Sequence, residues 1–161
     1  MIFAIDPGPD NTAYVVFDGD KPLSGEIVPS KDLIGSLIIA NGTFEKSIKQ
    51  VACEHLQCFG QAVGAEVFET AYWIGEYRGF CRSVSVPFHR VTRIQVKMTL
   101  CHTTKANDSN IRCAIIDRFG GPLKAIGKKK TPGPLYWVKK DLWSALAVAI
   151  TYQERSAYRA Y

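Results

Sequence analysis

The chain has 161 residues, of which 47% are hydrophobic and 22% charged, and this balance is typical of a folded domain and excludes wholesale disorder. A chain of this length fits one domain, so we expect a single domain over residues 1–161 that needs no disulfide or structural metal to fold. No apolar run reaches the roughly 18 residues that a membrane span needs. The first residues lack the charged segment and cleavage site of a secretion signal, so we expect no secretion.

Charge and cysteine content narrow the class further. The net charge is +5 and the isoelectric point is near 9.0, a balance that favours nucleic acid as a partner. The five cysteines form no C-x-x-C pair, and no His/Cys pair stands at zinc-finger spacing, which argues against a zinc site. We therefore expect reduced thiols in a cytoplasmic protein, either bacterial or phage-encoded and present in the host cytoplasm.

The first third of the chain predicts an antiparallel meander followed by a parallel strand. Met1–Asp6 is an apolar run that ends in an acid, and Thr12–Phe17 is rich in β-branched and aromatic residues. A third strand is expected near Leu23–Val28, and a helix over part of Lys31–Lys49 that breaks or ends at Asn41-Gly42. Ser47–Glu54 contains a short apolar run that again ends in an acid, which is typical of a central parallel strand.

The rest of the chain alternates helix and strand. Helical spacing of apolar residues predicts a helix over Gly64–Phe80, which a short strand over Val84–Pro87 follows. A helix or turn is expected over Thr92–Thr99, and then a helix over Ser109–Phe119 capped by Asp108 or Ser109. Local turn signals predict a loop over Gly120–Pro134, and a final helix is expected over Tyr136–Arg155. This order predicts an α/β fold with a mixed sheet and helices on both faces.

Three acids stand where a metal site could form. Asp6 and Glu54 each end an apolar strand, and Asp141 opens the last helix. The carboxyl ends of strands form the rim where ligands bind in open α/β folds, and carboxylates meeting there would repel each other unless a cation held them. Magnesium suits such oxygen ligands. Each acid alone has an ordinary alternative as a turn residue or as a first-turn acid stabilised by the helix dipole.

Four segments together resemble the RuvC-type Holliday-junction resolvases of the RNase H-like superfamily. These segments are IDPGPDNTAYVVF at Ile5–Phe17, ACEHLQCFGQAVGAEVFETAYWIGEYRGF at Ala52–Phe80, RIQVKMTL at Arg93–Leu100 and DLWSALAVAITY at Asp141–Tyr152. They follow one another in the family's order across nearly the whole chain. The resemblance implies an RNase H-like mixed five-stranded sheet with helices on both faces, and one nuclease domain over residues 1–161.

The resemblance also assigns roles to single residues. Asp6 and Glu54 match the first two metal ligands, Lys97 matches a lysine that approaches the scissile phosphate, and Asp141 matches the first acid of a closing acid-x-x-acid pair. The implied mechanism is phosphodiester hydrolysis by two magnesium ions about 4 Å apart, one held by Asp6 and Asp141 and the other by Asp6 and Glu54. Mn²⁺ is expected to substitute, and the product would carry a 5′ phosphate.

Two positions depart from the family pattern. The second acid of the closing pair falls on Ser144, and a second family lysine falls on Asp108, with Lys105 nearby as a replacement. Three alternatives follow. Asp141 serves alone, Asp108 or Ser144 completes the metal site, or the protein binds DNA and cuts it poorly.

The function implied is a magnesium-dependent, structure-selective endodeoxyribonuclease that cuts Holliday junctions or other branched DNA. The alternatives are a related nuclease acting on flaps or RNA–DNA hybrids, and a noncatalytic junction-binding protein. Phosphate contacts are expected from basic residues, and Phe59 could stack on a base. The candidate contacts are Arg78, Arg82, Arg90, Arg93, Lys105, Lys128, Lys129, Lys130, Lys139 and Lys140. A homodimer is implied, with the helix over Gly64–Phe80 at its interface.

Overall fold

A mixed five-stranded sheet in the order β3-β2-β1-β4-β5 lies at the centre of the computed structural model, which describes residues 1–43, 48–58, 60 and 62–158. β1, β2 and β3 are antiparallel neighbours, whereas β4 and β5 run parallel to β1. The strands are β1 (Ile2–Asp6), β2 (Asn11–Phe17), β3 (Pro22–Pro29), β4 (Gln50–His55) and β5 (Phe88–Thr92). The expected meander and the central parallel strand are confirmed.

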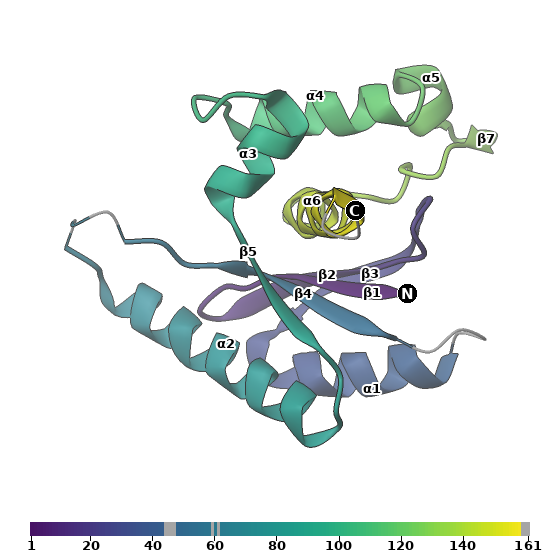
Figure 1. The fold of residues 1–161 in the computed structure, drawn as a ribbon. Helices are drawn as coiled ribbons and strands as arrows, with labels where there is room; N and C mark the ends of the chain where they lie inside the picture. The colour runs from purple at the N-terminus through teal and green to yellow at the C-terminus, as the bar shows by residue number, and fades with distance from the viewer. Residues whose placement is uncertain (44–47, 59, 61, 159–161) are drawn as a thin grey trace.

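Helices cover both faces of this sheet, as expected (Figure 1). One face carries α1 (Leu33–Thr43), which follows the short 3₁₀ helix η1 (Ser30–Asp32), and α2 (Ala65–Ser83). The other face carries α3 (Arg93–Cys101), α4 (Asp108–Arg118), α5 (Pro122–Ala125) and α6 (Leu142–Tyr158), with a small hairpin of β6 (Gly127–Lys128) and β7 (Thr131–Pro132).

Alternation along β1 divides the hydrophobic core into two parts. Phe3 and Ile5 belong to the part under α1 and α2, whereas Ala4 belongs to the part under α6. This alternation follows because successive side chains of a strand point to opposite faces. Ala4 lies beside Ala52 of β4 in the parallel register, and both are fully buried. Two such small residues let α6 approach the sheet closely.

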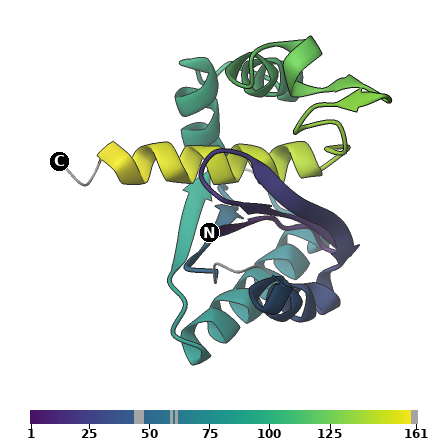
Figure 2. The same ribbon diagram turned by 90° about the vertical axis from the view of Figure 1, so that its right-hand side faces the viewer.

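The closing helix α6 is buried on nearly all sides in its middle. Every residue from Ala145 to Ile150 is at most 1% exposed, so the buried residues are not confined to one face of the helix. The reason is visible in Figures 1 and 2: α6 runs between the sheet and the layer formed by α3, α4 and α5. A helix enclosed in this way is apolar all round.

The fifth strand lies further along the chain than the sequence predicts. The predicted strand over Val84–Pro87 is wrong, because the amides of Val84 and Val86 donate to the carbonyls of Phe80 and Cys81 and so form the C-terminal turn of α2. β5 instead spans Phe88–Thr92, at the edge of the sheet, where few apolar residues are needed.

The segment 120–134 is also more structured than the loop expected there. It contains α5 and the β6–β7 hairpin. Gly127 has a φ of 72°, and a Cβ at this position would lie 2.3 Å from the carbonyl oxygen of Thr131, so only glycine fits. The final helix begins at Leu142 instead of Tyr136, since the chain first makes a turn in which Lys140 has a φ of 47°.

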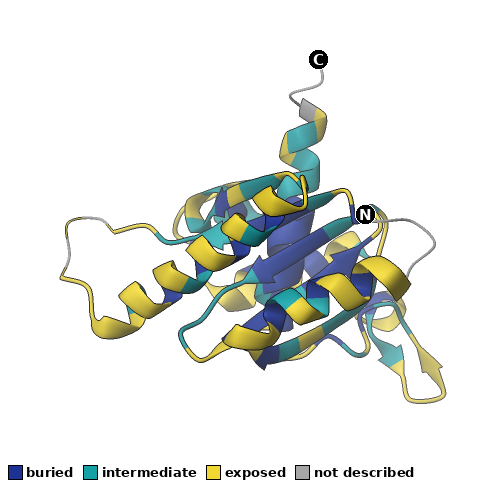
Figure 3. Cartoon of the chain, turned by 90° about the horizontal axis from the view of Figure 1, so that it is seen from below, coloured by how far each residue is buried: buried dark blue, intermediate teal, exposed yellow. Residues whose placement is uncertain are grey.

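Helix boundaries elsewhere agree with the sequence to within a few residues. The N-cap of α4 is Asn107, one residue before the predicted Asp108, because Asn107 and Asn110 form a reciprocal capping box. All five cysteines are free thiols, as expected. In the described part of the chain, the helices are too short or too polar to cross a bilayer. Seen from below, α1 and α2 expose their outer sides and bury the sides that face the sheet (Figure 3).

Candidate active site

Asp6 and Glu54 lie side by side at the ends of two parallel strands. Ile5 of β1 pairs with Cys53 of β4, so the next residue on each strand is an acid at the same rim of the sheet. The Asp6 carboxyl is hydrogen-bonded to the Glu54 carboxylate. Burial, reinforced by the negative charges of Glu54 and Asp141, raises the pKa of Asp6 to about 8, although Arg93 opposes this shift. The predicted meeting of Asp6 and Glu54 is therefore present in the structure.

A pocket of about 560 Å³ opens in front of this pair. It lies between the sheet rim and α3, and it is lined by Asp6, Glu54, His55, Arg93, Lys97 and Thr104, among others. Lys97, the predicted phosphate-contacting lysine, therefore stands in the same pocket as the two carboxylates. His55 also lies there, and its Nδ1 atom is buried without a hydrogen-bond partner in the described part of the protein.

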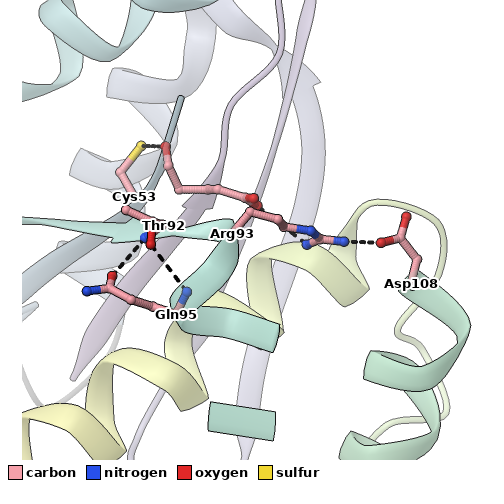
Figure 4. A network of polar contacts seen from close by, with 6 residues as sticks. Cys53, Thr92, Arg93, Gln95 and Asp108 are labelled. Carbon is pink, nitrogen blue, oxygen red and sulfur yellow. Dashed lines mark hydrogen bonds and ion pairs between the residues drawn. The ribbon is translucent and has the colours of Figure 1, made fainter. Parts of the chain in front are cut away.

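Arg93 is the cation that directly neighbours the acidic pair. Its Nη1 atom lies 3.7 Å from Oε2 of Glu54, and its Nη2 atom donates to Oδ1 of Asp108 (Figure 4). Burial raises the pKa of Glu54, whereas the positive charge of Arg93 and the hydrogen bond from Asp6 lower it. Asp108 is therefore engaged by Arg93 at the outer edge of the site. Lys105 is exposed in the turn before α4.

Asp141 approaches Asp6 from another direction. A second hollow of about 340 Å³ is lined by Asp6, Asp141 and the loop of residues 7–11. Asp141 is exposed, and its carbonyl oxygen accepts hydrogen bonds from the amides of Ser144 (3.0 Å) and Ala145 (3.1 Å), which places it at the start of α6. Ser144 is partly buried one turn further on. Asp6 thus lies between Glu54 on one side and Asp141 on the other.

The arrangement suits divalent ions only in part. The donors at the rim are carboxylate oxygens, which hard cations such as Mg²⁺ prefer. Burial, together with the negative charges of Glu54 and Asp141, raises the pKa of Asp6 to about 8, and a cation bound here would relieve the repulsion among these acids. However, within the described residues no three acidic, histidine or cysteine side chains are grouped closely enough to hold one ion together. The predicted site of Asp6, Glu54 and Asp141 stays a prediction.

A buried polar network supports the loop after Asp6, and sequence reasoning missed it. The Thr12 hydroxyl lies 2.9 Å from the Ser30 hydroxyl and 3.0 Å from the Tyr77 hydroxyl, and the Ser30 hydroxyl donates to the Gly8 carbonyl. Trp73 donates from its indole nitrogen to the Pro9 carbonyl at 2.9 Å. These bonds hold the loop to α2 and so help to fix Asp6. In the sequence, the spacing of Trp73 and Tyr77 indicates only that they share one face of a helix. It does not show which groups they hydrogen-bond.

The predicted DNA contacts are spread over the molecule. Lys128, Lys129 and Lys130 belong to the β6–β7 hairpin and its turn, and all three are exposed. In Figures 1 and 2 this hairpin lies well apart from α3. The pocket is lined by residues of α3, so the hairpin is not next to it. Lys139 and Lys140 are exposed just before Asp141. The exposed arginines Arg78 and Arg82 lie on α2, and exposed Arg90 lies on β5. Phe59 lies outside the described residues.

Comparison with known proteins places the fold. No family model matches the chain, and no curated protein matches its sequence. RuvC of T. thermophilus in complex with a Holliday junction substrate is 19% identical, with 96% of this chain and 93% of that chain covered and a TM-score of 0.69. A second structure, of Thermus thermophilus RuvC, is 21% identical, with 98% and 95% covered and a TM-score of 0.66. The chain therefore has the RuvC-type form of the RNase H-like fold.

Proposed function

We propose that this protein is a magnesium-dependent endonuclease that cuts Holliday junctions or other branched DNA. The observation that carries the proposal is the hydrogen-bonded pair of Asp6 and Glu54 at the sheet rim, which lines one pocket together with Arg93 and Lys97. Carboxylates for a metal and cations for a phosphate, lining one pocket, are the groups that phosphodiester hydrolysis requires. The likeness in fold to a RuvC bound to a Holliday junction substrate supports branched DNA as the substrate.

Each residue would have a distinct task. Asp6 and Glu54, with Asp141 on the other side of Asp6, would hold two Mg²⁺ ions, and Mn²⁺ would replace them. Bound there, such ions lower the pKa of water and neutralise the phosphate. Lys97 offsets the charge that grows on the phosphate, an effect typically worth a few kcal/mol. The Asp6 loop is kept in place by the hydrogen bond from Trp73 to Pro9 and by Ser30, which donates to Gly8 and accepts from Tyr77.

A cleavage assay tests this function directly. A labelled four-way junction, a flap and an RNA–DNA hybrid are incubated with the protein, with and without Mg²⁺. We expect cleavage of the junction that needs the metal and leaves a 5′ phosphate. Asp6→Asn should abolish cleavage and spare binding, whereas Asp20→Asn, in an exposed turn at the other end of β2, should change neither. Cleavage by Asp6→Asn at the normal rate would refute the assignment.

A noncatalytic junction-binding protein is the second candidate. It is favoured by Ser144, which stands where the family has an acid. It is also favoured by the finding that, within the described residues, no three acidic, histidine or cysteine side chains are grouped closely enough to hold one ion. Such a protein would bind the labelled junction tightly without nicking it at any Mg²⁺ or Mn²⁺ concentration. In that case Ser144→Asp would be the variant to restore cleavage.

We also propose a homodimer that packs through α2. Phe68 and Tyr72 are 66% and 56% exposed, and Gly75 and Gly79 continue the same stripe of the helix. A Cβ added to either glycine meets nothing within 4 Å. Glycine inside a helix costs about 1 kcal/mol relative to alanine, so nothing within the described protomer favours it here. A closely approaching second helix would.

Sedimentation measures this association. Wild type should sediment as a dimer and Phe68→Glu as a monomer. Ile39→Glu, which changes an equally exposed residue of α1, should leave the dimer intact. A wild-type protein that stays monomeric at high concentration would contradict the proposal.

Two active sites in one symmetric dimer would suit the paired cuts that a four-way junction needs. The free cysteines support action in a reducing cytoplasm.

A further inference from the structure

The Arg93 guanidinium stands between two carboxylates. One nitrogen lies 3.7 Å from Glu54, at the inner wall of the pocket, and the other donates to Asp108, which is 84% exposed on α4 (Figure 4). The Arg93 side chain itself is 28% exposed. Its head group therefore reaches from the carboxylate pair to the outer rim of the pocket.

The backbone that carries Arg93 is held firmly. Thr92 caps α3, since its hydroxyl accepts from the Gln95 amide at 3.2 Å while its own amide donates to Oε1 of Gln95 at 2.8 Å. Val96 anchors the same turn in the core and is fully buried. Lys97 follows Arg93 by four residues, so the two cations share one face of the helix. Both line the pocket in front of Asp6 and Glu54.

A guanidinium in this position is prepared to bind a phosphate. Its planar fork matches phosphate oxygens as well as carboxylates. It has five N–H donors, and the contacts to Glu54 and Asp108 each involve a single nitrogen. Without Asp108, the ion pair with Glu54 would be the one that remains of these two contacts, and Arg93 would neutralise more fully the acid that we assign to the metal.

We propose that Arg93 binds the DNA phosphate that enters this pocket, and that Asp108 is a positioning residue that orients Arg93. This inference rests on the proposed nuclease function and goes beyond it. It also separates two roles for Asp108, because an acid that completes the metal site would act on the metal directly, whereas a positioning residue acts only through Arg93.

A double-mutant cycle distinguishes these roles. Wild type, Arg93→Ala, Asp108→Ala and the double variant are compared by the anisotropy of a labelled junction in EDTA, where no cleavage occurs. Arg93→Ala should weaken binding by about tenfold or more, the usual effect of losing a charge-assisted hydrogen bond. It should also lower the slope of log K against log salt by about 0.9, the value of one phosphate contact. Arg93→Lys should keep the slope and recover only part of the affinity.

Asp108→Ala should weaken junction binding when Arg93 is present and have no effect when Arg93 is absent. The second readout is the rise in melting temperature that Mg²⁺ causes in the absence of DNA. This rise should be the same for the double variant as for Arg93→Ala. The pair Arg118 and Glu154, which form the same kind of contact between α4 and α6, provides the matched control, and its alanine variants should leave both readouts unchanged.

Three results would overturn parts of this argument separately. If Asp108→Ala lowers the Mg²⁺ response equally with and without Arg93, Asp108 is a metal ligand and the positioning role is wrong. If wild type binds and cuts the junction but Arg93→Ala binds it equally well, the phosphate role is wrong while the nuclease function stands. If wild type binds no branched DNA, the proposed function itself fails.

Discussion

Replacing Asp6 by asparagine should stabilise the metal-free protein at pH 8, although it removes a residue that we propose for catalysis. Asp6 is held against Glu54 in a buried position, and its pKa rises from an ordinary 3.8 to about 8. Between these values the folded protein keeps a proton that the unfolded chain has released. The free energy of unfolding therefore falls as the pH rises from about 4 to about 8. Asparagine can keep the hydrogen bond to Glu54 without this cost.

The difference between the two pKa values sets the size of the effect. At about 1.4 kcal/mol per pH unit, a rise from 3.8 to about 8 corresponds to an upper bound of about 6 kcal/mol. A quarter of that bound, about 1.5 kcal/mol, would raise the melting temperature of a protein of this size by about 3 °C or more. Because the rim of the sheet is open and can relax around the charged carboxylate, the real effect is smaller than the upper bound. We therefore expect Asp6→Asn to raise the free energy of unfolding at pH 8 by an amount between about 1.5 and about 6 kcal/mol.

Urea and thermal unfolding in EDTA at pH 5 and pH 8 measure this gain. Asp6→Asn should be more stable than wild type, and the difference in the free energy of unfolding should be clearly larger at pH 8 than at pH 5. Asp20→Asn should have the stability of wild type at both pH values. Mg²⁺ should stabilise wild type more than Asp6→Asn, because it binds where the charge is concentrated. An Asp6→Asn variant whose advantage is the same at both pH values would refute the electrostatic reasoning. A single cooperative transition would also support one domain over residues 1–161.

Three further predictions concern the support of the site and its approach. Tyr77→Phe removes the hydroxyl that bonds Thr12 and Ser30, so it should cost about 1–3 kcal/mol in urea unfolding; an unchanged midpoint would mean that the network is not needed. Leu146→Ala opens a cavity in the enclosed middle of α6 and should cost about 2–5 kcal/mol by the same measurement. Replacing residues 128–130 by alanine should lower the salt slope of junction binding by up to about 2.7, at about 0.9 for each phosphate contacted; an unchanged slope would exclude the hairpin from the DNA path.

Local patterns predicted the sheet well where strands are buried. Met1–Asp6 and Ser47–Glu54 are apolar runs that end in an acid, and the two strands pair in parallel with the acids adjacent at the rim. The pattern failed at the edge strand β5. There the apolar residues Val84 and Val86 close a helix, whereas the strand itself contains His89 and Arg90. An edge strand is covered less than a central one, so its sequence carries a weaker signal.

The sequence by itself determined which acids could form the site, because a charge that ends a buried strand is visible in one short segment. Only the tertiary structure decided which groups meet there. Thr12 and Tyr77, which support the Asp6 loop, are 65 residues apart in the chain, and Arg93 and Asp108, which we propose act together, are 15 apart on different helices. Such contacts depend on how helices pack against the sheet, and no periodicity within a single element encodes them.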